Sequence, residues 1–450
     1  MKTKTFATIV GGMIFVMATV TGLAVMGILY VANQQSDDTA RQREEPISED
    51  VPDADLSTVY IWDGRANAVV MLDLETGNRD VQALVSQPDS YIIQPRISDD
   101  GTYAAFCQNI RSGDTISDIV FTVHNLRTNQ MVFTESFGLI AGCEAGAFNQ
   151  DGTQVTVGVV HNNPIMGVVN FPDMPDWVLR VYDVSTGNIT QEFNADNPSA
   201  PDLATLDDDY WFEPNISPML RGVAFVDDTI YLTAHPFVGR DAAFRHPAYT
   251  WNVVTNEWTF LEGLTHIGAD LLAQTGEVVY PYLDENYDYA TPPGPSPRAN
   301  TVRVDDNGTQ RTIYRNTEEV IMRTQFINGG SHVLLTLVPN FDYENPDPDS
   351  AGATNYAILD REGNLTRLSN TTRWYQQSSA TADGYISFYF NQTEVTNSMY
   401  NLVHTRIEGD TISQTLLWTH APDLNRASYS FLWSAPMPVR DNLAPFAPLN

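Results

Sequence analysis

Three acidic stretches that contain aromatic side chains are the strongest candidates for binding chemistry in this 450-residue sequence. Their aromatic residues are Tyr210, Trp211 and Phe212, then Tyr287 and Tyr289, and finally Phe341 and Tyr343. Aromatic faces beside carboxylates suit sugars, cationic groups or peptide segments. The alternative is that the aromatic rings hold long loops against the fold while the acids keep the surface soluble. The residues alone leave both interpretations open.

The third stretch also contains a run of alternating acids with the character of an ion site. Its members are Asp342, Glu344, Asp347 and Asp349. Calcium prefers several oxygen ligands, so a structural Ca²⁺ is one hypothesis for this run. No glycine-centred loop with a closing glutamate follows, which excludes an EF-hand, and a solvated run of charges is the alternative. We predict no other cofactor.

Three histidines are the remaining candidates for metal chemistry. His161 and His235 each follow an expected second strand, and His266 precedes an expected first strand. Three imidazoles can hold Zn²⁺ with an open position, although no close ligand spacing supports this and each ring can equally cap a loop. The sequence contains no G-x-S-x-G, phosphate loop, H-E-x-x-H or C-x-x-C-H motif, so we name no catalytic residue.

Cys107 and Cys143 are the only cysteines in the chain. They lie in neighbouring repeats, and both fall toward the same face of the expected fold. In an oxidising exterior a disulfide between them is the interpretation of interest, with two separate buried thiols as the alternative.

The net charge of −32 restricts the partners of the chain. The only lysines are Lys2 and Lys4, and every later basic residue is arginine. A surface this acidic repels nucleic acid and anionic lipid headgroups, so we predict neither as a partner.

The segment 6–32 contains no charged residue and is long enough to cross a bilayer as a helix. Lys2 and Lys4 precede it and acidic residues follow it, which places the N-terminus in the cytoplasm and the remainder outside. A cleaved signal peptide is the alternative, but its apolar region would be much shorter. We therefore expect a short cytoplasmic segment at 1–5, a transmembrane anchor at 6–32 and a flexible acidic stalk at 33–57.

From Thr58 onward a unit of about 50 residues recurs, which is typical of propellers and repeat arrays. One half of the unit is an alternating hairpin with a turn rich in Asp, Asn, Thr and Gly. It occurs seven times, at 69–81, 121–133, 179–193, 250–261, 302–314, 356–368 and 402–418. The other half, a strand, a turn and an apolar strand, occurs six times, at 92–108, 145–160, 221–234, 268–282, 323–338 and 378–390.

The missing seventh copy is divided between the two ends of the repeat region. Arg426–Pro436 has the form of an innermost strand, and Thr58–Gly64 has the form of a second strand. Joined, they complete a seven-bladed, all-β propeller over 58–440, in which pairing of the two chain ends removes exposed sheet edges. Residues 441–450 are then a C-terminal tail.

The strand-turn elements resemble the WD40-like repeats of TolB-type periplasmic propellers. In that family this element has the approximate form W-S-P-D-G-x-x-I-A-F, which Ile97–Phe106 matches best. The stretches 148–152 and 382–388 match more loosely, and 432–436 keeps the start of the pattern. The resemblance covers most of 58–436, but the motif is degenerate, so it implies a fold and no particular activity.

The long connections are confined to one face of the expected propeller. They are 108–118, 161–176, 235–247, 284–300 and 339–355, with an inter-blade insert at 194–217. Turns on the other face are two to four residues long. Function on a repeat scaffold usually lies in such loops. We therefore expect a binding or scaffold module for an extracytoplasmic protein or polysaccharide. The alternative is a carbohydrate-active surface enzyme with paired carboxylates in the central mouth.

Overall fold

The computed structural model describes residues of the unit Ala54–Asn450, beginning at Thr58. The described ranges are 58–64, 66–84, 90–93, 95–113, 115–161, 177–194, 218–236, 246–284, 299–339, 355–368, 374–392, 398–409, 411–420, 429–432 and 443–449. Among these residues no helix is long and apolar enough to cross a membrane. The expected anchor at 6–32 and stalk at 33–57 lie outside the described residues.

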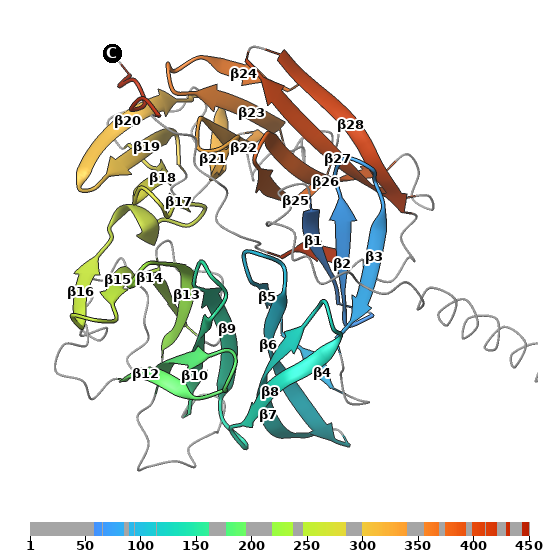
Figure 1. Cartoon of the computed structure of the whole chain (residues 1–450). Coiled ribbons are helices and arrows are strands. Elements are labelled where there is room, and N and C mark those ends of the chain that lie inside the picture. Colours follow the sequence, from blue (N-terminus) through green and yellow to red (C-terminus); the bar gives the residue numbers. More distant parts are fainter. Residues whose placement is uncertain are drawn as a thin grey trace, which may run out of the picture. The chain divides into compact units, whose positions relative to one another are not determined.

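The described strands form seven antiparallel sheets, which we call blades 1 to 7 (Figure 1). Blade 1 contains β29 (Tyr429–Phe431), β1 (Thr58–Asp63), β2 (Ala68–Asp73) and β3 (Arg79–Ala83). Blade 2 contains β4 (Tyr91–Ile92), β5 (Arg96–Ile97), β6 (Tyr103–Ser112), β7 (Thr115–Asn125) and β8 (Gln130–Ser136). Blade 3 contains β9 (Gly142–Phe148), β10 (Gln154–Val160), β11 (Trp177–Asp183) and β12 (Ile189–Asn194).

The remaining four blades repeat the same plan. Blade 4 contains β13 (Pro218–Val226), β14 (Thr229–Pro236), β15 (Ala248–Asn252) and β16 (Glu257–Phe260). Blade 5 contains β17 (Asp270–Leu272), β18 (Glu277–Tyr282), β19 (Thr301–Asp306) and β20 (Thr309–Arg315), preceded by the short 3-10 helix η3 (Gly263–Thr265). Blade 6 contains β21 (Glu319–Ile327), β22 (His332–Pro339), β23 (Asn355–Asp360) and β24 (Leu365–Arg367). Blade 7 contains β25 (Trp374–Thr381), β26 (Gly384–Gln392), β27 (Ser398–Glu408) and β28 (Thr411–His420).

Turn chemistry explains why the hairpins form where the sequence predicts them. Asn129, Asn256 and Asn307 have φ values of 51°, 60° and 49°, and each lies in the turn before an outer strand. Asparagine tolerates this left-handed conformation better than most residues because its short polar side chain bonds locally. All seven predicted hairpins and all six predicted strand pairs are confirmed.

The core is divided into clusters that each join two neighbouring blades. One residue from each blade represents each junction. In order from the junction of blades 1 and 2 to that of blades 7 and 1, the pairs are Trp62 with Phe106, Phe121 with Val157, Leu179 with Leu232, Ala248 with Val278, Val302 with Leu335, Ile358 with Tyr385, and Phe388 with Val70. Every junction, including the one between the last and the first blade, is therefore filled by buried apolar side chains. The seven sheets form a closed ring, as a propeller requires.

The predicted split of blade 1 is confirmed. β29 pairs antiparallel with β1, with Ile61 opposite Phe431 and Asp63 opposite Tyr429. Leu432 N–H adds a hydrogen bond of 3.0 Å to the carbonyl oxygen of Tyr60. In Figure 1 the red strand β29 lies against the blue strand β1. Residues from the two ends of the repeat region thus share one sheet.

Two expectations about connections were wrong. The segment 108–118 is not a long loop, because β6 and β7 extend through most of it and pair as far as Ser112 opposite Thr115. Isoleucine, threonine and alternating polar residues continue the ladder there as an exposed extension of the hairpin. On the opposite face the turns reach five residues, as in 149–153, because Asp151 receives bonds from Thr153 that close a wider turn.

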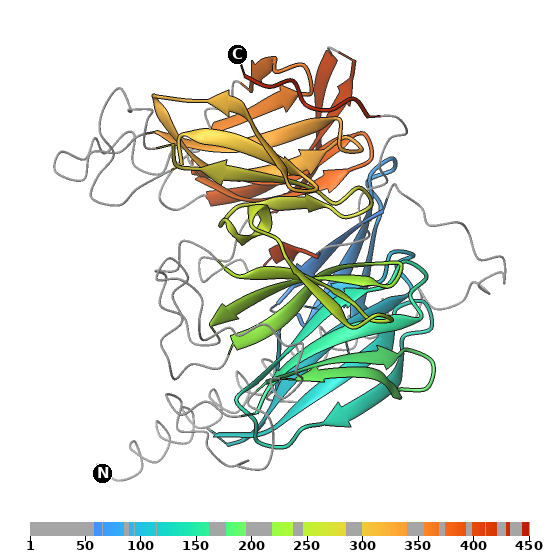
Figure 2. The ribbon, with the colours of Figure 1, turned by 90° about the vertical axis from the view of Figure 1, so that its left-hand side faces the viewer.

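The C-terminal residues 443–449 pack against blades 5 and 6. Phe446 is buried in their shared cluster, and Leu443 packs against it. Ala447 N–H donates to the carbonyl oxygen of Arg361 at 2.7 Å, and Leu449 N–H donates to that of Thr312 at 2.9 Å. Figure 2 shows this red segment along the yellow and orange strands. The tail therefore forms part of the folded unit.

Candidate functional site

Most of the residues predicted to bind ligands lie outside the described residues. This applies to Tyr210, Trp211, Phe212, Tyr287, Tyr289, Phe341 and Tyr343, and to the acids Asp342, Glu344, Asp347 and Asp349. The positions of their segments in the chain are nevertheless defined by the strands on either side, and this is used below.

The three histidines do not form a described metal cluster. His161 is buried at the end of blade 3, and the His266 ring stacks on Tyr280 with centroids 4.6 Å apart. The His235 side chain lies outside the described residues. Across the described part of the chain, no group of three or more His, Cys, Asp or Glu side chains is arranged to hold a metal ion.

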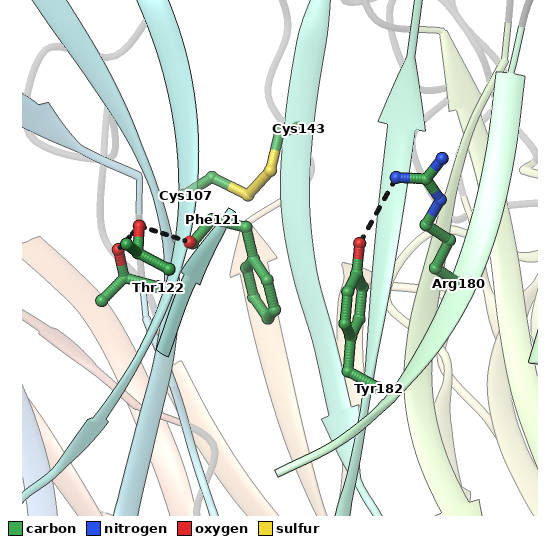
Figure 3. The surroundings of a disulfide bond; sticks show 7 residues. Cys107, Phe121, Thr122, Cys143, Arg180 and Tyr182 are labelled. Atoms are coloured by element: carbon green, nitrogen blue, oxygen red, sulfur yellow. Dashed lines mark hydrogen bonds between the residues drawn. A yellow bond between two sulfur atoms is a disulfide. The ribbon is translucent and has the colours of Figure 1, made fainter. Parts of the chain in front are cut away.

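Cys107 and Cys143 form a disulfide with a Cα–Cα distance of 5.8 Å (Figure 3). Cys107 belongs to β6 and Cys143 to β9, so the bond joins blades 2 and 3. Both residues are buried in the cluster that contains Phe121 and Tyr182, whose rings lie 5.3 Å apart. The disulfide fixes the position of the innermost strand of blade 3 relative to blade 2.

A charged cluster on the innermost strands of blades 2, 3 and 4 was not identified from the sequence. It consists of Arg96 on β5, Glu144 on β9 and Arg221 on β13. Arg221 Nε lies 2.9 Å from Glu144 Oε1, and the two side chains are 28% and 19% exposed. Arg96 is only 6% exposed. We call these three residues the arginine cluster.

The electrostatics of the arginine cluster are dominated by Arg96. Burial lowers the pKa of its guanidinium, and the negative charge of Glu144 opposes that shift. The Arg96 Nη2 atom is buried and has no hydrogen-bond partner among the residues that the structure describes. A buried charged donor without a partner is unfavourable, because desolvation is not compensated. Glu144 is shared with Arg221, so these three side chains together carry one net positive charge.

Local structure explains how the arginine cluster is positioned. Arg96 on β5 lies opposite Ala105 on β6. Ala105 is two residues before Cys107 on the same strand. Ile93 N–H donates to the carbonyl oxygen of Cys107 at 2.9 Å, and Glu144 directly follows Cys143. The disulfide therefore holds together the two backbones that carry Arg96 and Glu144.

The sequence contains a signal that points to these residues. Arg96, Arg221 and Arg323 each begin the apolar stretch that leads into the turn of an innermost strand, as RISDDG, RGVAFVDD and RTQFINGG. Because the chain has few basic residues, an arginine that recurs at the same position of the repeat indicates a specific role for that position. It passes unnoticed when only the turn residues of the repeat are compared.

A second polar contact joins the innermost strands of blades 5 and 6. Asp270 Oδ2 accepts a hydrogen bond of 2.7 Å from Phe326 N–H. Burial raises the pKa of Asp270 to about 6, although the Phe326 N–H and the charge of Arg323 oppose this shift. Thr324 Oγ1 donates to the carbonyl oxygens of Gly268 and Val279, each at 3.0 Å. The Asp270 carboxylate and the Thr324 hydroxyl thus both have hydrogen-bond partners within the fold, in contrast to Arg96 Nη2.

Comparison with known proteins gives a likeness of fold. No protein-family model matches the chain, and no curated protein sequence matches it. The solved structures similar to it include the β-propeller domain of the Trilobed protease from Pyrococcus furiosus, with a TM-score of 0.45 and 14% identity over 80% of this chain and 88% of that chain. The Pyrococcus horikoshii acylaminoacyl peptidase gives 0.43 and 15% over 80% and 50%, and prolyl oligopeptidase B from Galerina marginata gives 0.48 and 10% over 79% and 48%.

The chain thus spans about half the length of these two peptidases. Its own strand order makes it a seven-bladed β-propeller, which is the fold that the resemblance to TolB-type, WD40-like repeats implies.

Proposed function

We propose that this protein is a membrane-anchored, extracytoplasmic binding or scaffold module. Its partner is a protein or an envelope polysaccharide, bound through one face of the propeller. We call this the decorated face and define it by the connections 161–176, 237–247, 283–300 and 340–354, together with the inter-blade segment 195–217.

The order of the strands supports a single decorated face. In each four-stranded antiparallel blade, the link from the second to the third strand and the link to the next blade leave the same side. The segments 161–176, 237–247, 283–300 and 340–354 are all second-to-third links, and 195–217 is a link between blades 3 and 4. Links on the opposite side are short turns such as 227–228 and 307–308.

The aromatic residues carry the proposal. All seven predicted binding aromatics belong to three of these connections, namely 195–217, 283–300 and 340–354. The closed ring is a rigid base, and binding residues commonly lie on loops presented by such a base. Tyrosine and tryptophan supply large contact areas with a polar edge, which suits protein and carbohydrate surfaces.

The binding test replaces aromatic residues on the decorated face of the full-length chain. Tyr210, Trp211 and Phe212 are changed to Ala together, and binding is measured to a panel of purified envelope polysaccharides and by cross-linking to surface proteins in intact cells. We expect at least a tenfold loss of a partner that the unaltered chain binds. The matched control changes Thr186 and Asn188 in an exposed turn of the opposite face. Equal loss in both variants, or turnover of a polysaccharide, would contradict a binding role for this face.

The anchor is tested separately. Protease added to intact cells should digest the propeller while sparing an N-terminal tag, and alkaline carbonate should leave the chain with the membrane fraction. Replacing apolar residues at the centre of 6–32 with Asp should release it. A chain that is extracted by carbonate or protected from protease would overturn the proposed location.

A further inference from the structure

We propose that the arginine cluster, formed by Arg96, Glu144 and Arg221, is a binding site for a carboxylate. The ligand is a small carboxylic acid or the C-terminal carboxylate of a peptide. The observations behind this proposal are a buried guanidinium whose Nη2 atom has no hydrogen-bond partner among the described residues, and the carboxylate of Glu144, whose charge acts on Arg96 and which pairs with the partly exposed Arg221. This site is on the inner edges of blades 2 to 4 and does not depend on the decorated face.

The unpartnered donor requires an explanation that packing does not give. Arginine is among the side chains least often buried without a partner. Arg361 is also buried, and its guanidinium bonds to Glu277 Oε2 at 2.7 Å, to the carbonyl oxygen of Ala444 at 2.8 Å and to that of Gly330 at 2.9 Å. This fold is therefore able to satisfy a buried arginine, whereas Arg96 Nη2 has no hydrogen-bond partner among the described residues. Arg311 Nη2 also makes no hydrogen bond there, but it lies 3.7 Å from Glu277 Oε1.

Charge balance selects a monoanion. Two guanidinium groups and one carboxylate leave one positive charge in the arginine cluster, and Glu144 is the one acid whose charge acts on Arg96 among the described residues. A single carboxylate neutralises that charge. A phosphate dianion would exceed it and would lie beside the Glu144 carboxylate, where like charges repel.

The geometry of the donors also favours a carboxylate. A guanidinium presents its N–H groups in a plane, which matches the two oxygens of a carboxylate and gives short, charge-assisted hydrogen bonds. Arg221 contributes the accessible part of the proposed site, since its side chain is 28% exposed.

The first experiment titrates the purified full-length chain with defined probes. N-acetylglycine, N-acetylglycinamide, inorganic phosphate and chloride are compared by calorimetry at matched ionic strength. A tetrapeptide with a free C-terminus is compared with its amide to separate the peptide source from the free acid. We expect saturable binding of the carboxylates and at least tenfold weaker binding of the amides and of phosphate. Equal binding of carboxylate and amide, or no carboxylate binding, would overturn the proposal.

The second experiment assigns the site to the arginine cluster. Arg96→Gln and Arg221→Gln should each weaken carboxylate binding at least tenfold, and Arg96→Lys should restore only part of it because it lacks the planar donors. Arg111→Gln, at an exposed position at the far end of β6, should bind as the unaltered chain does. Unchanged binding in both cluster variants would exclude this location.

A stability measurement separates a ligand site from a structural role. Arg96→Met removes the unpartnered donor and leaves Glu144 paired with Arg221. Without ligand it should melt at or above the temperature of the unaltered chain, and it should lose the rise in melting temperature that a bound carboxylate produces. Marked destabilisation of ligand-free Arg96→Met would show that the fold itself needs the arginine.

Discussion

At the residue scale, three arginine ion pairs join neighbouring blades. Arg180 lies 3.0 Å from Glu135, Arg221 lies 2.9 Å from Glu144, and Arg361 lies 2.7 Å from Glu277. Each pair connects a strand or turn of one blade to the blade before it. The planar guanidinium can bond several acceptors at once, which a lysine ammonium cannot do with fixed geometry.

Glu277→Gln tests the buried pair between blades 5 and 6. Both side chains are 7% exposed, and the Arg361 guanidinium also lies 4.3 Å from the Phe446 ring in the tail. Removing the acid leaves the buried Arg361 charge without its carboxylate partner, so we expect a loss of about 3–5 kcal/mol in the free energy of unfolding. Denaturant titration measures this loss. Glu257→Gln on the exposed strand β16 is the control, and a loss as small as in that control would argue that the pair is dispensable.

Asp99→Asn tests a pH dependence that arises from one buried carboxyl. Burial, assisted by the negative charge of Asp100, raises the pKa of Asp99 to about 7, whereas an unfolded aspartate titrates near 3.9. Between these values the folded chain binds a proton that the unfolded chain does not, so stability falls as the pH rises through this window. The variant avoids that loss, and we expect it to gain about 1–3 kcal/mol at pH 8 and little at pH 4.

The measurement for Asp99→Asn is the difference in melting temperature from the unaltered chain across pH 4 to 8. Asp80→Asn, on the exposed strand β3, is the matched control. A stabilisation that is the same at both ends of the pH range would contradict the assignment to Asp99.

At the element scale, the sequence allowed the strands to be predicted well and the site poorly. Hairpins such as 179–193 can be predicted from the alternation of apolar and polar residues and from their turn residues, which are local properties of the sequence. The length of the β6–β7 hairpin was missed because polar residues at its exposed end resemble those of a loop. The arginine cluster was missed because its members come from three blades, and only the packing shows that Arg96 Nη2 has no hydrogen-bond partner in the described part of the chain. The docking of Phe446 on blades 5 and 6 was missed for the same reason.

Gly158→Ala tests the close approach of blades 3 and 4. A Cβ atom at Gly158 would meet the carbonyl oxygen of Leu220 on β13, which is backbone and cannot move aside cheaply. We expect a loss of about 1–3 kcal/mol in the free energy of unfolding, as for other overpacked cores. Differential scanning calorimetry measures it. Gly384→Ala should behave similarly, because its Cβ would meet the Thr405 carbonyl oxygen, and neutral behaviour of both would refute the packing argument.

Cys107→Ala with Cys143→Ala tests the cross-link between β6 and β9. The disulfide closes a loop with a sequence separation of 36, and its loss should lower the free energy of unfolding by about 3–4 kcal/mol. Melting temperatures with and without reductant provide the measurement. Reductant should lower that of the unaltered chain and leave that of the double variant unchanged. The double variant should also bind carboxylate more weakly, since Glu144 loses its fixed neighbour.

At the scale of the whole molecule, the ring depends on pairing between β29 and β1. Ser430→Pro removes a backbone N–H from β29, and Ser430 lies two residues from Leu432, whose N–H bonds to Tyr60. Proline is poorly tolerated in a paired strand, so we expect loss of the β29–β1 pairing and a lower unfolding midpoint. Hydrogen exchange should rise at Tyr60 and Trp62, whose backbone groups face β29, and not at Ile61, whose N–H faces β2. Ser430→Ala is the control, and unchanged exchange in Ser430→Pro would show that the ring closes by side-chain packing alone.

The shared sheet of blade 1 also sets the order of events when the protein is made. β1 is among the first strands to leave the ribosome, and its partner β29 is synthesised after almost all of the other strands. During that interval the inner edge of blade 1 has no partner and is open to proteases and to other nascent chains. A product terminated before residue 429 would keep this open edge permanently. Ring closure therefore distinguishes complete molecules from truncated ones, and it gives cellular quality control a structural feature to detect.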